Sequence, residues 1–370
     1  MIYTAKDGGK GDFMLVWLLM LGAITLLWFM IPEAIGEKKK KLIFLWLSGL
    51  LLAFLMGSRC PYRSGSGDVY VYYLTYTRTA VDSIADIAKH YYMEESYLWI
   101  NKFLMSVIPW GQFIIYLEAV VSTLAVFRFI YKNTENVYLG VVVYICTGGW
   151  AFFLTGFRQA FAISICLFAF EYMKKRQFAM DLVALGIVLF ASLFHNTAWL
   201  FLLAFVMRKL KLNRLTVFVT VCITILSFVA MNLFVDMIEE MMGTNYRVGY
   251  EGNLFGGIVP IVVFASALLL SFMAWMQDKE YLEKYSFQIS MLMAGLCLYL
   301  FRYNTVVFER MSYYFTIMVC SVLPNSICAI KDKRTQIICK AFCIVLCMAL
   351  FVYRISDSGR YYFYWERLLT

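Results

Sequence analysis

The sequence predicts an all-α fold, a polytopic transmembrane bundle of about 12 spans, with roughly 11 to 13 as the range that its apolar runs allow. Hydrophobic residues make up 62% of the 370 residues and charged residues only 15%, which excludes the usual water-soluble classes. Apolar runs recur along the whole chain, and the composition does not shift between its parts. We therefore expect a single integral membrane domain over residues 1–370.

A bilayer core about 30 Å thick needs roughly 20 apolar residues for each crossing helix. The candidate spans are residues 13–32, 42–57, 112–131, 137–154, 157–173, 178–194, 196–207, 215–235, 257–276, 286–303, 311–330 and 336–353. The first run is too long for a signal peptide and lacks a small-residue cleavage site, so we expect it to be a permanent span. The run at 196–207 is too short unless it extends into the basic run behind it or pairs with the preceding span as a broken hairpin.

Positive charges predict the orientation. With every span counted, the short Lys-rich connections fall on one side, which the positive-inside rule assigns to the cytoplasm. Both termini then lie outside, with the loops 58–111, 236–256, 302–310 and 354–370. Arg predominates in the outer segments and Lys in the inner ones. The inner Lys clusters supply much of the net charge of +9 and contact anionic lipid heads, so this charge does not indicate nucleic acid.

The outer loop 58–111 is the longest break between predicted spans. Residues 82–107 have a roughly helical apolar spacing interrupted by charges, which is typical of amphipathic helices on a membrane surface. A second reading is that they cover a lateral entrance for a lipid substrate. Glu94 or Glu95 is available as an outer-face base, although nothing local distinguishes either of them.

The front of this loop contains a polar cluster. Arg59 and Arg63 carry planar guanidinium groups that suit phosphate or carboxylate. Gly65 and Gly67 allow backbone N–H groups to approach a ligand, and Asp68 follows at once. The tyrosines suited to stacking on sugar rings are Tyr70, Tyr72, Tyr73 and Tyr76. The alternative is an interfacial loop whose tyrosines anchor at the headgroups, with Arg59 favourably placed at a helix C-terminus.

Arg158 and Gln159 open the fifth predicted span at its outer side. The helix dipole places partial positive charge at this end, so an Arg there is unfavourable without an anion. With a phosphate bound, the position becomes favourable, because the free N–H groups and the guanidinium then both point at the phosphate. The alternative is that Arg158 snorkels to the headgroups.

Glu309 and Arg310 repeat this arrangement at the start of the eleventh predicted span. The alternative is a structural salt bridge from Glu309 to Arg310 or Arg302. His195 lies between two spans at outer depth, either as a hydrogen-bonded structural residue or as an acid, base or phosphate contact, since its unperturbed pKa is about 6.5. With two His and no CxxC pair, we expect no metal site.

These segments together resemble the EpsG-type branch of the Wzy-like polysaccharide polymerases, over most of the chain. The Arg-Gln and Glu-Arg pairs match best, whereas the inserted Cys60-Pro61 departs from the pattern and places Arg63 in doubt. The segments that carry the resemblance are Gly57-Ser-Arg59 with Asp68 and the tyrosines, Gly156-Phe-Arg158-Gln159-Ala-Phe-Ala-Ile, Lys174-Lys-Arg, Ala191-Ser-Leu-Phe-His195-Asn, and Phe308-Glu-Arg310-Met-Ser-Tyr-Tyr314-Phe.

The resemblance implies a GT-C-like membrane glycosyltransferase of the bacterial cytoplasmic membrane. It would join undecaprenyl-pyrophosphate-linked oligosaccharide repeat units at the outer face, without a cofactor, in contact with membrane lipids and with other polysaccharide-assembly proteins as further partners. Arg158 and Arg310 are expected to bind pyrophosphate, and Arg59 or Arg302 the second lipid or acidic sugar groups. Asp68 is the first choice for a general base and His195 the second. The supporting residues are Arg63, Tyr72, Tyr73, Gln159, Glu309 and Tyr314.

Three other functions stay open. A flippase or exporter of the same lipid-linked sugars would need charges at midmembrane depth, which the predicted spans avoid. A membrane O-acyltransferase would place His195 at its centre and take its donor from the cytoplasmic side, where the short Lys loops leave little room for a coenzyme. A non-catalytic assembly partner is the third.

Overall fold

The computed structural model describes residues 10–62, 67–213, 215–216, 220, 222, 225–226, 230, 254–303, 306–355 and 361–369. Within these residues the chain is built from helices, and the one β-type pairing is an isolated bridge between Arg59 and Phe363. The predicted all-α class is therefore confirmed.

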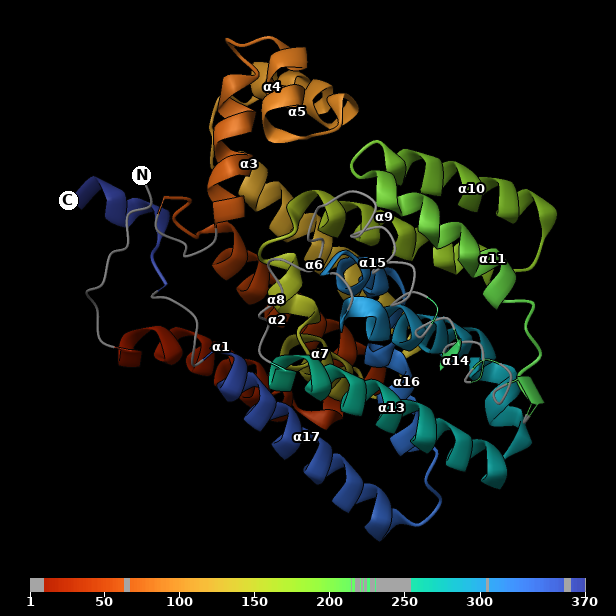
Figure 1. The fold of residues 1–370 in the computed structure, drawn as a ribbon. Helices are drawn as coiled ribbons and strands as arrows, with labels where there is room; N and C mark the ends of the chain where they lie inside the picture. Colours follow the sequence, from red (N-terminus) through yellow and green to blue (C-terminus); the bar gives the residue numbers. More distant parts are fainter. Residues whose placement is uncertain are drawn as a thin grey trace.

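Within the described residues, most helices follow one another through short connections (Figure 1). The elements up to residue 133 are α1 (Lys10–Met30), η1 (Glu33–Ile35), α2 (Glu37–Gly57), α3 (Gly67–Arg78), α4 (Ile84–Tyr91), α5 (Glu95–Val107) and α6 (Phe113–Asn133). The middle elements are α7 (Val137–Cys146), α8 (Gly149–Phe153), α9 (Phe157–Met173), α10 (Phe178–Ser192), η2 (Asn196–Leu202) and α11 (Leu203–Met207). The last elements are α13 (Leu254–Gln277), α14 (Lys279–Leu300), η3 (Phe301–Tyr303), α15 (Val306–Thr316), α16 (Val319–Cys328), α17 (Lys333–Ile355) and η4 (Tyr364–Leu369).

Several helices are long and apolar enough to cross a membrane. Within the described residues there are four, namely α2, α6, Gly257–Gln277 of α13, and α17, and a bent pair gives a fifth if α15 and α16 form one span. Other apolar helices are shorter, such as Val137–Cys146 and Phe178–Ser192. The predicted span 215–235 lies mostly outside the described residues, so the count of about 12 spans stays a prediction.

Two of the predicted spans are broken inside the bundle. The span predicted at 137–154 divides into α7 and α8 at Gly148, whose φ of 99° suits a glycine. The span predicted at 311–330 divides into α15 and α16, which meet at a bend of 46°. Breaks of this kind are tolerated at membrane depth where protein surrounds them, and they bring helix ends into the interior.

Contacts join segments that were predicted to lie on the same side of the membrane. At one end, called the loop end, residues 58–62 and 361–369 lie together: Cys60 N donates to Tyr362 O at 2.8 Å and Tyr364 N to Ser58 O at 2.9 Å. The loop end also includes 78–112, 154–158 and 193–197, and Figure 1 shows α4 and α5 standing above the rest of the bundle there.

The opposite end, called the lysine end, contains residues 132–136, 174–177, 208–213, 278–284 and 328–334. Lys174 Nζ donates to Asn133 Oδ1 at 2.6 Å. Lys284 Nζ lies 2.6 Å from Glu135 Oε1. The basic turns predicted to face the cytoplasm are thus joined to one another by hydrogen bonds and ion pairs.

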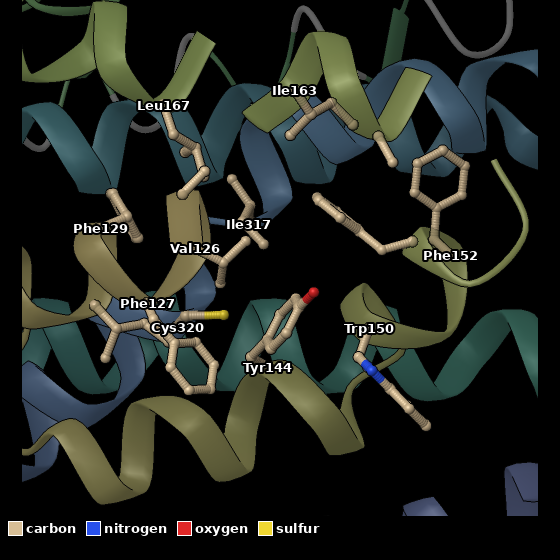
Figure 2. Close-up of a cluster of buried hydrophobic side chains, with 14 of the residues drawn as sticks. Val126, Phe127, Phe129, Tyr144, Trp150, Phe152, Ile163, Leu167, Ile317 and Cys320 are labelled. Atoms are coloured by element: carbon tan, nitrogen blue, oxygen red, sulfur yellow. The ribbon is translucent and has the colours of Figure 1, made fainter. Parts of the chain in front are cut away.

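The core lies where α6, α7, α8 and α9 meet the break between α15 and α16 (Figure 2). Lipid tails are as apolar as these side chains, so close packing rather than escape from water holds such helices together. Small polar contacts add to it, as where Thr134 Oγ1 donates to Cys320 O at 3.2 Å. The buried residues that Figure 2 labels are Val126, Phe127, Phe129, Tyr144, Trp150, Phe152, Ile163, Leu167, Ile317 and Cys320.

Candidate functional site

The start of α9 carries Arg158 at the second position of the helix. Gly156 precedes the helix as its N-cap and has no side chain to bind the free N–H groups of the first turn. A Cβ at Gly156 would lie 2.8 Å from the Phe152 ring, so glycine also permits the tight approach of α8. The first turn of α9 therefore combines a guanidinium with unfilled backbone donors.

Glu94 neutralises Arg158 from across the loop end. Arg158 Nη1 donates to Glu94 Oε2, and Arg158 Nη2 lies 3.4 Å from the carbonyl oxygen of Tyr92. The second carboxylate oxygen, Glu94 Oε1, accepts from Asn196 N at 3.1 Å. Glu94 is also the N-cap of α5. This residue therefore links the start of α5 to the starts of α9 and η2.

His195 lies beside this carboxylate, with Nδ1 at 3.9 Å from Glu94 Oε1. Its Nδ1 accepts from Thr197 N at 3.2 Å, so the neutral ring carries its hydrogen on Nε2. The Thr197 hydroxyl lies 3.1 Å from the hydroxyl of the fully buried Tyr314. Burial lowers the pKa of His195 to about 4, Arg158 and Arg310 act in the same direction, and Glu94 opposes them.

Arg310 reaches the same place from α15. Gln159 Nε2 donates to Arg310 O at 2.8 Å and ties the first turn of α9 to α15. Arg310 interacts electrostatically with His195 and Tyr72, its side chain is exposed, and no hydrogen bond or ion pair holds its guanidinium within the described residues. Arg310 is the fifth residue of α15, one turn later than predicted, so the helix-dipole argument holds for Arg158 and is weaker for Arg310.

Tyr72 of α3 completes the group. Its ring stacks on Phe157 with centroids 4.9 Å apart and planes at 5°, and its hydroxyl interacts electrostatically with Arg158. Asp68, exposed in the first turn of the same helix, interacts electrostatically with Tyr72. We call Tyr72, Glu94, Arg158, His195 and Arg310 the loop-end cluster.

The groups in this cluster are suited to binding an anion. It holds two guanidinium groups, one carboxylate, a neutral imidazole and a phenol. The Nε2–H of His195 and the exposed Arg310 are donors, which match the oxygens of a phosphate. Within the described residues no three His, Cys, Asp or Glu side chains gather as metal ligands.

Arg302 and Glu309 form a separate group. Arg302 Nη2 lies 3.2 Å from Glu309 Oε2, and Arg302 Nη1 donates to the Tyr299 hydroxyl at 2.5 Å. The ion pair proposed as the alternative for Glu309 is therefore present, with Arg302 as its partner. Glu309 also interacts with Tyr313, which stacks on Phe152 with centroids 4.2 Å apart.

Arg59 is not part of the loop-end cluster. It is 5% exposed, and it donates to Met56 O at 2.9 Å and to Leu154 O at 2.6 Å. Tyr73 packs on Tyr62 with ring centroids 5.3 Å apart and fills the space beside Gly111. Arg63 lies outside the described residues. The structure thus brings Tyr72, Arg158, His195 and Arg310 together, and it places Arg59 inside the protein.

Sequence reasoning did not single out Glu94 of the cluster or Thr197, which contacts His195 of the cluster. Glu94 differs from its exposed neighbour Glu95 only by its partners, and those partners lie 64 and 102 residues away in the chain. Its one local signal is its position as N-cap before an amphipathic helix, a place that many residue types occupy.

A comparison with protein families gives one match. The model of the EpsG family matches residues 15–366, a range that includes every residue of the loop-end cluster. No curated protein and no solved structure matches the chain.

Proposed function

The chain belongs to the EpsG family, a family of Wzy-like polysaccharide polymerases, and from this premise we propose that it joins undecaprenyl-pyrophosphate-linked oligosaccharide repeat units at the outer face of the bacterial cytoplasmic membrane. The loop end then faces outward and holds the active site together with both termini, and the lysine end faces the cytoplasm in agreement with the positive-inside rule. The expected scaffold is a GT-C-like bundle of about 12 spans.

The observation that carries the proposal is the convergence of Arg158 and Arg310 on Tyr72 and His195. In the proposed reaction an acceptor sugar hydroxyl attacks the anomeric carbon of the growing chain. Its oxygen forms the new bond to C1, the bond from C1 to the pyrophosphate oxygen breaks, and the electron pair stays with the lipid pyrophosphate. Negative charge therefore grows on the leaving group, and preorganised cations stabilise it.

Each member of the cluster has a proposed part in this step. Arg158 is held by Glu94, so its position is set before substrate arrives. Arg310 is exposed and supplies a guanidinium to the incoming pyrophosphate. The Nε2–H of His195 donates a further hydrogen bond to a phosphate oxygen. Because Nδ1 accepts from Thr197 N, we propose His195 as a donor in place of the general base that the sequence suggested as second choice.

Arg302 is proposed to contact the second lipid pyrophosphate or acidic groups of the glycan. Its ion pair with Glu309 must open or rearrange for this, because one guanidinium edge is already occupied. Gln159 and Tyr314 act as supports, Gln159 by tying α9 to α15 and Tyr314 by holding the Thr197 hydroxyl. Asp68 stays a proposed general base, beside Tyr72 and exposed at the loop end.

The test is direct. The protein is purified into lipid nanodiscs and supplied with its cognate lipid-linked oligosaccharide repeat, and the products are separated by length. We expect longer lipid-linked glycans from the wild type and none above background from Arg158→Ala. Wild-type protein that does not elongate a verified cognate substrate would refute the assignment. Translocation without elongation would indicate the flippase alternative.

A further inference from the structure

A carboxylate is buried inside the protein below the loop-end cluster. Glu118 lies in α6, one and a half turns from its start at Phe113, and is 0% exposed. Ile114, Ala119 and Ser122 share its buried face. An isolated charge in such surroundings costs far more than an exposed one, so a buried carboxylate needs a compensating partner or a function.

The carboxylate of Glu118 has no direct protein partner. Within the described residues no hydrogen bond reaches either of its oxygens. The nearby Ser122 hydroxyl donates at 2.7 Å to the backbone oxygen of Glu118 instead. Arg59 interacts electrostatically with Glu118, and its Nη2 is also buried without a hydrogen-bond partner. Each group therefore keeps unused hydrogen-bonding capacity of the kind that a bridging water satisfies.

Two buried tyrosines interact electrostatically with Glu118. Tyr144 of α7 belongs to the core, where Figure 2 shows its hydroxyl oxygen pointing into the cluster of buried side chains. Tyr97 of α5 is 1% exposed and interacts electrostatically with Glu118, Tyr72 and Arg158. The rings of Tyr97 and Tyr72 meet edge to face, with centroids 6.5 Å apart and planes at 84°. Of the two, only Tyr97 interacts with both Glu118 and the loop-end cluster, and its buried hydroxyl has no hydrogen-bond partner within the described residues.

The other candidate proton acceptors near the cluster are less suited to the task. Both oxygens of Glu94 are occupied, by Arg158 and by Asn196 N. Nδ1 of His195 accepts from Thr197 N. Asp68 is exposed to water. Tyr72 interacts electrostatically with Arg158, and its phenol carries one hydrogen that it can donate.

We propose that Glu118 is the terminal acceptor of the proton released by the attacking sugar hydroxyl, reached through the hydroxyls of Tyr72 and Tyr97 and bridging water. This inference rests on the proposed function. As the new bond to C1 forms, the hydroxyl O–H bond breaks and its proton goes to Tyr72. Tyr72 passes its own proton to Tyr97, which passes its own to the Glu118 carboxylate. Glu118 becomes neutral, and the proton returns along the same line to the departing pyrophosphate or to outside water.

The experiment separates kcat from KM in the nanodisc elongation assay. Glu118→Gln keeps the shape of the side chain but cannot accept the proton, so we expect kcat to fall about 100-fold with KM unchanged. Tyr97→Phe should lower kcat about 10-fold, since loss of one hydroxyl interrupts the relay but leaves water as a substitute. Glu118→Asp should recover part of the activity. Tyr144→Phe is the matched control and should retain wild-type kcat.

The outcomes are distinguishable from a failure of the proposed function. Absence of elongation by the wild type would refute the polymerase assignment itself. Wild-type elongation with an unchanged kcat in Glu118→Gln would overturn only the relay, as would a Tyr144→Phe loss equal to that of Tyr97→Phe. An unchanged Glu118→Gln beside an inactive Asp68→Asn would assign the base to Asp68. Thermal unfolding of each variant shows whether a lower kcat reflects loss of the folded protein. If Glu118→Gln does not fold, the kcat of Tyr97→Phe compared with that of Tyr144→Phe tests the relay.

Discussion

Glu94 and Arg158 form an ion pair that joins the N-cap of α5 to the first turn of α9. Both side chains are mostly buried, at 14% and 15% exposed. The amphipathic helices of the loop 58–111 are thereby attached to the bundle at the proposed site. Their position helps to orient Arg158, so the outer loop takes part in building the proposed anion site.

Replacing Glu94 should loosen this attachment. In Glu94→Gln the amide still accepts from Asn196 N, but it no longer carries the charge that faces Arg158. We expect a loss of about 1.5 to 3 kcal/mol in the free energy of unfolding, the usual range for a hydrogen bond to a charged group. Thermal unfolding of the purified protein measures this. Glu95→Gln changes an exposed neighbour and should leave the midpoint unchanged; equal shifts in both variants would contradict the role of Glu94.

Lysine should not substitute for arginine at the cluster. Arg158→Lys and Arg310→Lys keep the charge but lose the planar fork that binds two phosphate oxygens at once. We expect each variant to elongate at least about 10-fold more slowly than wild type, the equivalent of roughly 1.4 kcal/mol in the barrier. Arg128→Lys, at an exposed position in the last turns of α6, is the control and should keep wild-type activity. Full activity in both cluster variants would mean that charge alone is sufficient.

The two nitrogens of His195 can be tested separately. Asn places an oxygen near the position of Nδ1, so His195→Asn should retain the N-cap bond to Thr197 N and unfold within about 1 kcal/mol of wild type. It removes the Nε2–H donor and should slow elongation. His195→Gln instead places its amide near the Nε2 position, so it should lose the N-cap hydrogen bond to Thr197 N. The comparison is made by thermal unfolding and elongation rate side by side, and a fully active His195→Asn would exclude a phosphate contact through Nε2.

The pKa of His195 predicts a dependence of stability on pH. Burial lowers it from 6.5 to about 4 in the folded protein. The unfolded chain therefore takes up a proton as pH falls through about 6.5, while the folded site stays neutral until about 4. The stability that this site contributes is complete above pH 6.5 and is lost as pH falls from there to 4. Unfolding midpoints of wild type and His195→Asn across this window should differ in slope, and His90→Asn, at an exposed position, should behave as wild type.

Local patterns predicted part of the site. An Arg in the first turn of an apolar helix is unfavourable in isolation, and that argument identified Arg158 before any contact was known. The pairing of Arg158 with Glu94 was not predictable, because it depends on how the loop 58–111 folds back across 64 residues of chain. Arg59 is a contrasting case. It also carries a guanidinium in a polar loop, but its side chain is buried and donates to Met56 O in the last turn of α2.

The fold was predictable to a similar degree. Apolar runs identified α2, α6, α13 and α17, because about 20 apolar residues have few alternatives to a membrane helix. The same runs could not reveal the breaks at Gly148 and between α15 and α16. Those breaks depend on packing against neighbouring helices, which composition does not encode. One consequence is that Arg310 lies a turn deeper in its helix than its place in the apolar run suggested.

The central claim is that Arg158 and Arg310 act together on one lipid pyrophosphate. A double-mutant cycle in the elongation assay tests it most directly, with wild type, Arg158→Ala, Arg310→Ala and the double variant on the same cognate lipid-linked repeat. If both guanidinium groups bind the same leaving group, the losses are not additive, and the double variant is little slower than the slower single variant. Additive losses would place the two arginines on different groups, and wild-type rates in either single variant would contradict the account.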